Sequence, residues 1–371
     1  MQIDFHHAVT YVAARLAGMD HTKADIIAYA AQYVDDATNH GYIRFNNGVT
    51  YSRVASAHKM LDYSNFSELA NHRAWVPFHF LPGNDLKKAG ENHDNRFIYR
   101  LVCRPGSYVA QDMVRDCILD RNRPYGLHRL GVTMHSYIDT WAHYGFCGTA
   151  HEINRANDIT TLNADGSEVR DRNIKERLAG FFKGVFDNVA SDFVDTVQPL
   201  GHGAVLSYPD MPYLRWKYKN GLGDTIVRDN PRDFMAAAQA MYQAIARFRL
   251  GEPDAPVAPM AEKDRNTIAE LTMAFADADG DLRHKKWLDA IAGGAFSFGK
   301  QKVSYTPKGE GSWKYQALAT DKAKDDDHEV FPYRDCFLAS DWKLFHDAAI
   351  AHRFNVVHHI LLRYGICVGT G

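Results

Sequence analysis

The segment His135-Ser-Tyr-Ile-Asp139-Thr-Trp-Ala-His143 places three side chains of metal-binding type four residues apart. A helix turns once in about 3.6 residues, so all three would lie on one side of a helix. Imidazole and carboxylate are ligands that zinc and its neighbours in the first transition row prefer. His135 and His143 would be about 12 Å apart along the axis, from a rise of about 1.5 Å per residue. This spacing indicates two ions with Asp139 between them, because two-metal sites hold their ions roughly 3.5–4 Å apart.

Further candidate ligands precede this segment. His6 and His7 are neighbours, and neighbouring positions on a helix point about 100° apart, so we expect only one of them, His7, to face the site. Asp35 and Asp36 lie inside an otherwise apolar helix, where adjacent carboxylates repel and are costly to bury. A cation beside them would remove that cost. His58 stands alone in an apolar setting, which suits a ligand and a hydrogen-bonded core histidine equally well.

The later part of the chain adds one candidate ligand and several candidate substrate contacts. His202 lies between Gly201 and Gly203, and glycines allow the backbone to approach another element closely. We therefore expect His202 to join the site. Asp139 and an uncoordinated Asp36 are the expected catalytic carboxylates. The side chains expected to contact substrate are His79, in an aromatic segment broken by prolines, His128, Tyr208 and Asp210.

Apolar residues recur at helical spacing in most of the segments that must position these residues. The pattern predicts one all-α domain over residues 1–371, with loop insertions at 151–171 and 298–329 and the site drawn mainly from the N-terminal half. A short hairpin tip at Asn46-Asn47-Gly48, and a small hairpin instead of a loop at 151–171, are open alternatives. The segment 75–83 is expected to be extended. The predicted helices are 4–16, 23–38, 65–72, 106–119, 124–143, 172–196, 231–250, 260–277, 281–292 and 340–364.

The composition is that of a soluble globular protein. The 371 residues are 46% hydrophobic and 24% charged, with a net charge of −2 and no overall attraction to nucleic acid or anionic membrane. The five cysteines are scattered without a CxxC motif, which argues against a disulfide framework. The first residues show no secretory signal, and no apolar run approaches about 20 residues. We expect a cytoplasmic protein, with export that needs no cleaved signal left open.

The order of the candidate ligands resembles that of the zinc-dependent phospholipase C and fungal-type single-strand nuclease superfamily. Its members are helical and bind three zinc ions that hydrolyse phosphodiesters. The resemblance implies a ligand set of His7, Asp35 or Asp36, His58, His135, Asp139, His143 and His202. Whole phrases, such as Asp139-Thr-Trp-Ala-His143, are also similar to an uncharacterised bacterial and fungal protein family, which implies no activity.

The chain departs from the superfamily in two places. Its members use the amine of a processed N-terminal tryptophan as a ligand, whereas this chain begins with Met1, so we expect that ligand to be missing. The late His-x3-Asp/Glu motif is also absent, because the first Asp after His202 is Asp210, eight residues on. The resemblance therefore rests on ligand order over about 200 residues, and it implies two or three ions.

The expected function is hydrolysis of a phosphodiester by two or three divalent ions, zinc above all. A lipid head group suits an aromatic chain of near-neutral charge better than a nucleic acid strand does, and we expect a phospholipase C-like activity on a small-molecule or lipid substrate. Two alternatives stay open: a nuclease of the same superfamily, and a binding protein whose ions are fully coordinated and stabilise the fold. A histidine–aspartate phosphohydrolase ranks lower. Oligomeric state is not predicted.

Overall fold

The computed structural model describes residues 1–57, 68–169, 201–202, 205, 207–322 and 329–368. One helix, α6 (Gly126–Ala142), lies at the centre and is buried along almost its whole length. A helix that is buried all round needs neighbours on every side. The helices packed most extensively against α6 are α2 (His21–Asp36), α5 (Tyr108–Leu119), α8 (Asn230–Leu250) and α12 (Asp341–Asn355), and α3 (Glu68–Phe78) also contacts it.

Local sequence signals set the ends of these helices. The carboxylate of Asp20 accepts a hydrogen bond from the backbone N–H of Lys23 and caps α2, and Ser107 caps α5 in the same way. Asp229 accepts from the backbone N–H of Arg232 at the start of α8. The same helix ends at Gly251, whose φ of 79° is the left-handed conformation that glycine adopts without steric cost.

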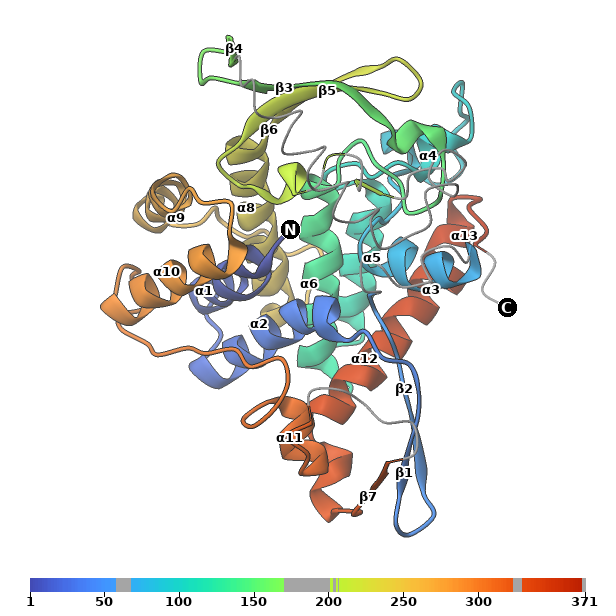
Figure 1. Ribbon diagram of the computed structural model, residues 1–371, viewed down its shortest axis with the longest axis vertical. Helices are drawn as coiled ribbons and strands as arrows, with labels where there is room; N and C mark the ends of the chain where they lie inside the picture. The colour runs from blue at the N-terminus through green and yellow to red at the C-terminus, as the bar shows by residue number, and fades with distance from the viewer. Residues whose placement is uncertain (58–67, 170–200, 203–204, 206, 323–328, 369–371) are drawn as a thin grey trace, which may run out of the picture.

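Shorter helices complete the helical body. A π-helical turn, η1, opens the chain and continues directly into α1 (Figure 1). The remaining helices and helical turns are η1 (Asp4–Val9), α1 (Thr10–Leu16), α3 (Glu68–Phe78), η3 (Asn84–Leu86), α4 (Ile98–Leu101), η4 (Glu152–Asn154), η7 (Tyr208–Asp210), α9 (Glu262–Ala274), α10 (Gly280–Gly293), α11 (Trp313–Leu318), η8 (Asp335–Ala339), η9 (Val356–Ile360) and α13 (Leu361–Arg363).

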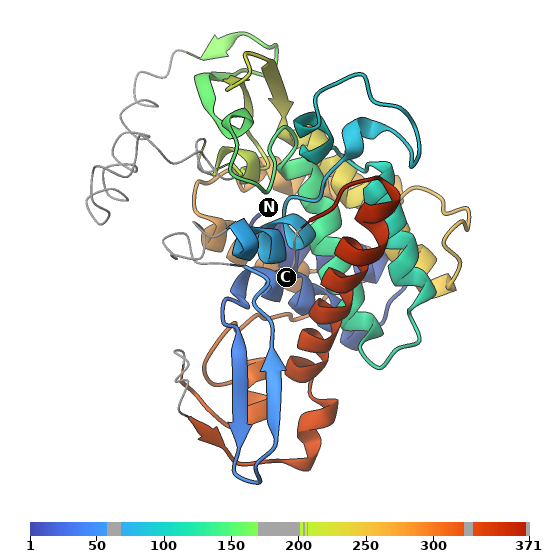
Figure 2. The same cartoon turned by 90° about the vertical axis from the view of Figure 1, so that its right-hand side faces the viewer.

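Two β-sheets stand at opposite ends of the long axis (Figures 1 and 2), so the prediction of an all-α fold is wrong. The first sheet is mixed, with strand order β2-β1-β7, and the second is antiparallel, with order β4-β3-β5-β6. Their strands are β1 (Gly41–Phe45), β2 (Thr50–Arg53), β3 (Ala156–Leu162), β4 (Glu168–Val169), β5 (Arg215–Asn220), β6 (Thr225–Asp229) and β7 (Val330–Phe331).

Most of the strands escaped prediction because they are short and few of their residues are buried. The exceptions are the hairpin turn at 46–48, between β1 and β2, and the small hairpin of β3 and β4 within 151–171. The clearest missed signal is β5, where Trp216, Tyr218 and Asn220 are buried and alternate with more exposed residues, as expected for one buried face of a sheet. Residues 151–171, predicted as a loop insertion, contribute β3 and β4 to the second sheet. Residues 298–329, the other predicted insertion, contain α11.

Most of the predicted helices are present, with ends shifted by a few residues. The expectation of an extended segment is wrong at its start, because α3 continues to Phe78 with Pro77 in its last turn. The final predicted helix is continuous in direction but contains the π-helical turn η9 (Figure 2). The predicted helix 172–196 and His58 lie outside the described residues. Among the described residues, no helix is long and apolar enough to cross a membrane.

The free energy of unfolding of the metal-free protein is expected to fall as the pH drops from about 6.5 toward 4. Burial lowers the pKa of His352 from 6.5 to about 3, and that of His284 to about 4. Between these pH values the two histidines bind protons in the unfolded chain but stay neutral in the folded chain. Each histidine therefore lowers the free energy of unfolding by roughly 2–3 kcal/mol by pH 4. Urea unfolding at pH 7 and pH 4.5 would measure this. His352→Gln, which lacks the titrating ring, should show a smaller dependence, and equal dependence would contradict the assignment.

Candidate metal centre

Histidine and aspartate side chains from six segments converge beside the C-terminal half of α6. His135 and Asp139 lie on α6 itself, one turn apart, and both are fully buried. The other members come from separate parts of the chain. They are His6 from η1, Asp35 from the end of α2, His79 after α3, His143 after α6, His202 and, from η7, Asp210.

A backbone carbonyl fixes the proton of three histidine rings. Nδ1 of His135 lies 2.8 Å from the carbonyl oxygen of Ala31, and Nε2 of His79 lies 3.0 Å from that of Ser56. Nδ1 of His143 lies 2.7 Å from the carbonyl oxygen of His79. Because a carbonyl can only accept, each of these nitrogens carries the proton. The second nitrogen of each neutral ring therefore presents a lone pair, as in histidines that bind metal.

Two of these lone pairs point at each other. His79 Nδ1 and His135 Nε2 are 3.1 Å apart, and two acceptors at that distance cannot form a hydrogen bond. One ring would have to be protonated, but burial lowers the pKa of His135 to about 4. A cation bonded to both nitrogens removes the conflict. Bonds of about 2.0–2.1 Å in tetrahedral geometry place neighbouring zinc ligands about 3.3 Å apart, close to the observed separation.

The two oxygens of Asp139 face different groups. Oδ2 lies 3.3 Å from His135 Nε2 and 3.5 Å from His79 Nδ1, and Oδ1 of Asp35 lies 3.8 Å from the same two nitrogens. Oδ1 of Asp139 lies 3.2 Å from Nε2 of His6, whose ring stacks on that of His135 with 3.7 Å between centroids. The two oxygens of Asp139 therefore contact different nitrogen atoms, and bridging of two ions by this carboxylate stays a prediction.

A second group of ligand atoms surrounds Asp210. Oδ1 of Asp210 lies 3.7 Å from the unprotonated Nε2 of His143, and its Oδ2 lies 3.7 Å from Nε2 of His202. The ring of Phe80 stacks on His143, with 4.4 Å between centroids, and holds it from the other face. These three polar side chains lie close enough to bind one ion together.

The α-amino group of Met1 lies inside the same centre. It donates a hydrogen bond of 2.6 Å to Oδ1 of Asp139 and is 3.2 Å from Oδ1 of Asp210. Burial alone would lower its pKa, but the two carboxylates outweigh that effect and raise the pKa of the amine to about 11. The resulting ammonium supplies positive charge between two buried carboxylates. The sequence predicted that the amine ligand of the superfamily would be missing. The amine of Met1 does lie in the centre, but as an ammonium it has no lone pair for a metal ion.

The electrostatics of the centre favour a bound cation. Burial lowers the pKa of His6 to about 4, so the ring is neutral near pH 7, the form that binds metal. Burial alone would raise the pKa of Asp139, but the neighbouring histidines and the Met1 ammonium hold it well below its usual range. Within the described part of the chain, both ring nitrogens of His6, Oδ2 of Asp139 and Oδ1 of Asp210 are buried without a hydrogen bond. Buried polar atoms of this kind are rare unless an ion or water satisfies them.

Three sets of side chains could each surround one ion. In each set, one ligand atom per residue lies within 4.8 Å of the others. Asp35 and His202 are the most exposed members, with 34% and 20% of the side chain accessible, so the centre opens to solvent at these residues. The sets are His6, Asp35 and His135; His79, His135 and Asp139; and His143, His202 and Asp210.

The structure brings together five of the residues predicted as metal ligands. It adds two residues predicted as substrate contacts, His79 and Asp210, whose nitrogen and oxygen atoms take ligand positions instead. It also adds His6, in place of the predicted ligand His7. The five predicted ligands that converge are Asp35, His135, Asp139, His143 and His202.

Four other predicted residues point elsewhere. His7 Nδ1 lies 2.9 Å from Nε2 of His284, away from the centre. Asp36 accepts hydrogen bonds from Tyr305 and Gln32. Nε2 of His128 lies 2.9 Å from the carboxylate of Asp341, and Tyr208 packs on Trp216 in the second sheet core.

The chain matches one family model over most of its length. The model is described as a family of unknown function (DUF6765), and it matches residues 1–360. The chain belongs to this family. No curated protein and no solved structure matches the chain. The matched range includes every residue of the candidate metal centre, from Met1 to Asp210, and the description of the family states no activity.

Proposed function

We propose that this chain is a metal-dependent hydrolase of phosphate esters that holds two divalent ions, zinc above all, on either side of Asp139. The observation that carries the proposal is the pair of lone pairs on His79 Nδ1 and His135 Nε2, 3.1 Å apart and directed at a buried carboxylate. A purely structural cluster of neutral side chains would place a donor opposite each acceptor. Here the two ring nitrogens and Oδ2 of Asp139 are all acceptors, and they lie within 3.5 Å of one another.

The ligands divide between two positions. His79, His135, Asp35 and Oδ2 of Asp139 would hold one ion, since all their ligand atoms lie within 3.8 Å of His135 Nε2. Oδ1 of Asp139 faces His6 Nε2 at 3.2 Å but also accepts from the Met1 ammonium at 2.6 Å, so an ion on this side would have to take the place of the ammonium. The second position would use a further set of ligands. That further set is His143, His202 and Asp210.

This arrangement suits hydrolysis of a phosphate ester. Two bound ions polarise a phosphoryl oxygen and lower the pKa of a water molecule toward about 7. Asp35, a proposed ligand of the first ion, is the carboxylate of that set that solvent reaches, so a water on that ion would lie beside it. Asp36, which we expected in this role, instead accepts a hydrogen bond of 2.6 Å from Tyr305. Asp36 therefore has no role in the proposed chemistry.

Purified protein given a choline phospholipid and single-stranded DNA would test the proposal. We expect chelator-treated protein to cleave neither and zinc to restore cleavage of one of them. Cleavage of the phospholipid would support the phospholipase C-like activity that the near-neutral charge favours. Cleavage of the DNA alone would support the nuclease alternative. No chelator-sensitive cleavage of either would overturn the hydrolase assignment.

One observation favours a second candidate, a binding protein stabilised by its metal ions. His6, His135 and Asp139 are completely buried, and structural metal sites are closed to solvent. In that case zinc should raise the melting temperature of the chelator-treated protein while no phosphate ester is cleaved. For a hydrolase, zinc should both raise the melting temperature and restore cleavage of a phosphate ester.

A further inference from the structure

Two segments that carry candidate ligands each divide a pair of consecutive residues between the metal centre and the packing behind it. On η1, His6 belongs to the centre and His7 points away from it. On α2, Asp35 faces the centre and Asp36 points away from it. Both outward residues meet Tyr305, whose ring centroid lies 5.1 Å from that of His7 and whose hydroxyl lies 2.6 Å from the carboxylate of Asp36. One residue from the C-terminal half of the chain therefore contacts both segments.

The side chain of Tyr305 is held against α2. Its ring packs on that of Tyr29, with 4.6 Å between centroids. The hydroxyl of Tyr29 donates a hydrogen bond to the carbonyl oxygen of Thr306, the next residue in the chain, so the backbone beside Tyr305 is tied to the same helix. A side chain whose own position is fixed can fix the position of its hydrogen-bond partner. Part of the segment predicted as the second loop insertion thus supports the site.

A chain of hydrogen bonds leads from Tyr305 to Asp35. An ionised carboxylate can only accept, so the phenol of Tyr305 donates to Oδ2 of Asp36. Nε2 of the buried Gln32, one turn earlier on α2, lies 3.3 Å from the same oxygen and 3.5 Å from Oδ2 of Asp35. The amide group has two hydrogens and can therefore donate to both carboxylates. The other oxygen of Asp35, Oδ1, is the one that lies 3.8 Å from the ligand nitrogens.

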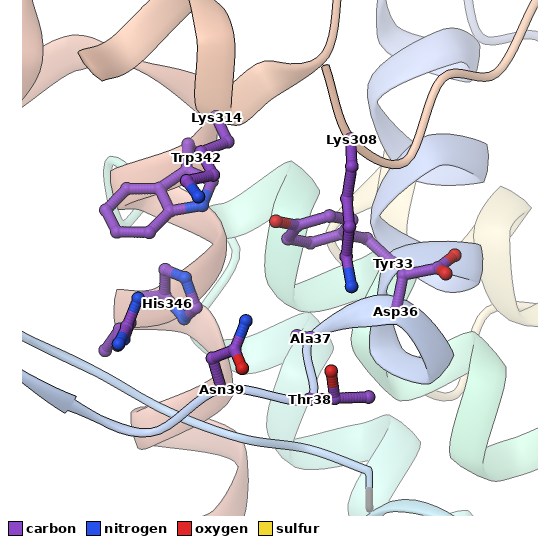
Figure 3. A pocket seen from close by; sticks show the side chains of 10 residues that line it. Tyr33, Asp36, Ala37, Thr38, Asn39, Lys308, Lys314, Trp342 and His346 are labelled. Atoms are coloured by element: carbon purple, nitrogen blue, oxygen red, sulfur yellow. The ribbon is translucent and has the colours of Figure 1, made fainter. Parts of the chain in front are cut away.

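The surroundings of Asp36 show that it needs no metal ion to compensate its charge. Its side chain lies in the wall of a small pocket at the end of α2 (Figure 3). Lys308 lines the same pocket, and its positive charge offsets part of the charge of this carboxylate. Asp36 is also the last residue of α2, because Ala37 has left the helical conformation. Holding Asp36 in place therefore limits the movement of the helix end that carries Asp35.

We propose that Tyr305, Asp36 and Gln32 form an orienting network that positions Asp35 for the first metal ion. The inference rests on the proposed function, because the network acts through a ligand of that metal centre. Its three members are positioning residues, since they reach the ion only through Asp35. Hydrogen-bond partners of metal ligands fix the orientation of those ligands, and their loss typically costs about 10–100-fold in metal affinity.

A zinc titration of the chelator-treated, full-length protein in competition with a colorimetric chelator would test the network. Tyr305→Phe removes one hydroxyl and keeps the ring, and we expect it to weaken zinc binding about tenfold. The matched control is Tyr51→Phe, which removes a hydrogen bond of 2.8 Å to the carboxylate of Asp347, outside all three candidate ligand sets. We expect this control to bind zinc as wild type does. A merely structural role of Tyr305 would lower the melting temperature in both variants and leave zinc affinity unchanged in both.

A second set of variants tests the route through the amide. Gln32→Met removes the group that joins the two carboxylates, and we expect it to weaken zinc binding by a similar factor. In the Gln32→Met protein, Tyr305→Phe should have no further effect, because the chain of hydrogen bonds is already broken. An equal loss from Tyr305→Phe in both backgrounds would overturn the network, as would unchanged zinc affinity in the single Tyr305→Phe variant.

The same titration separates this inference from the proposed function. A wild-type protein that binds no zinc would overturn the metal centre and the network together. Zinc binding that depends on Tyr305, in a protein that cleaves no phosphate ester, would support the network and refute the hydrolase assignment.

Discussion

Replacing Asp139 by asparagine is expected to remove at least one metal ion from each chain and to reduce hydrolysis more than about 100-fold. Losing a hydrogen-bond partner of a metal ligand already costs about 10–100-fold, and Asp139 is itself the central ligand of the proposed pair. Its two oxygens face His135 and His79 on one side and His6 on the other, so one substitution affects both positions. Elemental mass spectrometry of the purified variant would measure the loss.

The control is Asp341→Asn. Asp341 also contacts a histidine, with 2.9 Å between its carboxylate and Nε2 of His128, but this pair lies outside all three candidate ligand sets. We expect its metal content to equal that of wild type. Unchanged metal content in Asp139→Asn would overturn the bridging role of Asp139.

The substitution Gly131→Ala is expected to destabilise the protein and to lower its affinity for metal. Gly131 lies where α6 crosses α2, and an added Cβ would meet the carbonyl oxygen of Ile27 at 2.4 Å and the Cβ of Ala30 at 2.6 Å. Forcing extra atoms into a packed core costs roughly 1–3 kcal/mol. Because the carbonyl of Ala31 orients His135, the displaced helix would also misalign a ligand. Thermal unfolding and a zinc titration would measure the two effects.

Gly293→Ala is the matched control. Gly293 is the last residue of α10, and an added Cβ there would have no atom within 4 Å. Alanine in a helix is roughly 0.5–1 kcal/mol more favourable than glycine, so this variant should be as stable as wild type or slightly more stable. A Gly131→Ala protein with unchanged stability and unchanged zinc affinity would contradict the close crossing of α2 and α6.

The central part of the site was predictable because it depends on one helix. His135, Asp139 and His143 are related by helical spacing alone, and α6 is a regular helix up to Ala142. The sequence predicted that His7 faces the centre, whereas the structure places His6 there, and the reason is local. Residues Asp4–Val9 form a π-helical turn, in which successive side chains point in other directions than in an α-helix. The sequence contains no pattern that predicts this turn.

The remaining members depend on long-range packing. His79 was expected near substrate because of its aromatic setting, but its ligand role requires the carbonyl of Ser56, more than 20 residues earlier, to fix its proton. Asp210 meets His143 only because η7 folds back on the end of α6. The sheets were missed for a related reason, since short strands become recognisable only through their partners. Periodicity within one segment contains none of this information.

The residue His79 has a consequence for how ions would load. Its imidazole belongs to one proposed position, while its backbone carbonyl holds the ring of His143, which belongs to the other. An ion bound to the imidazole of His79 also orders the backbone carbonyl that holds His143. The second ion then binds ligands that are already ordered, so its binding costs less conformational entropy. The pair should therefore fill cooperatively, and a half-loaded chain should be scarce at every zinc concentration.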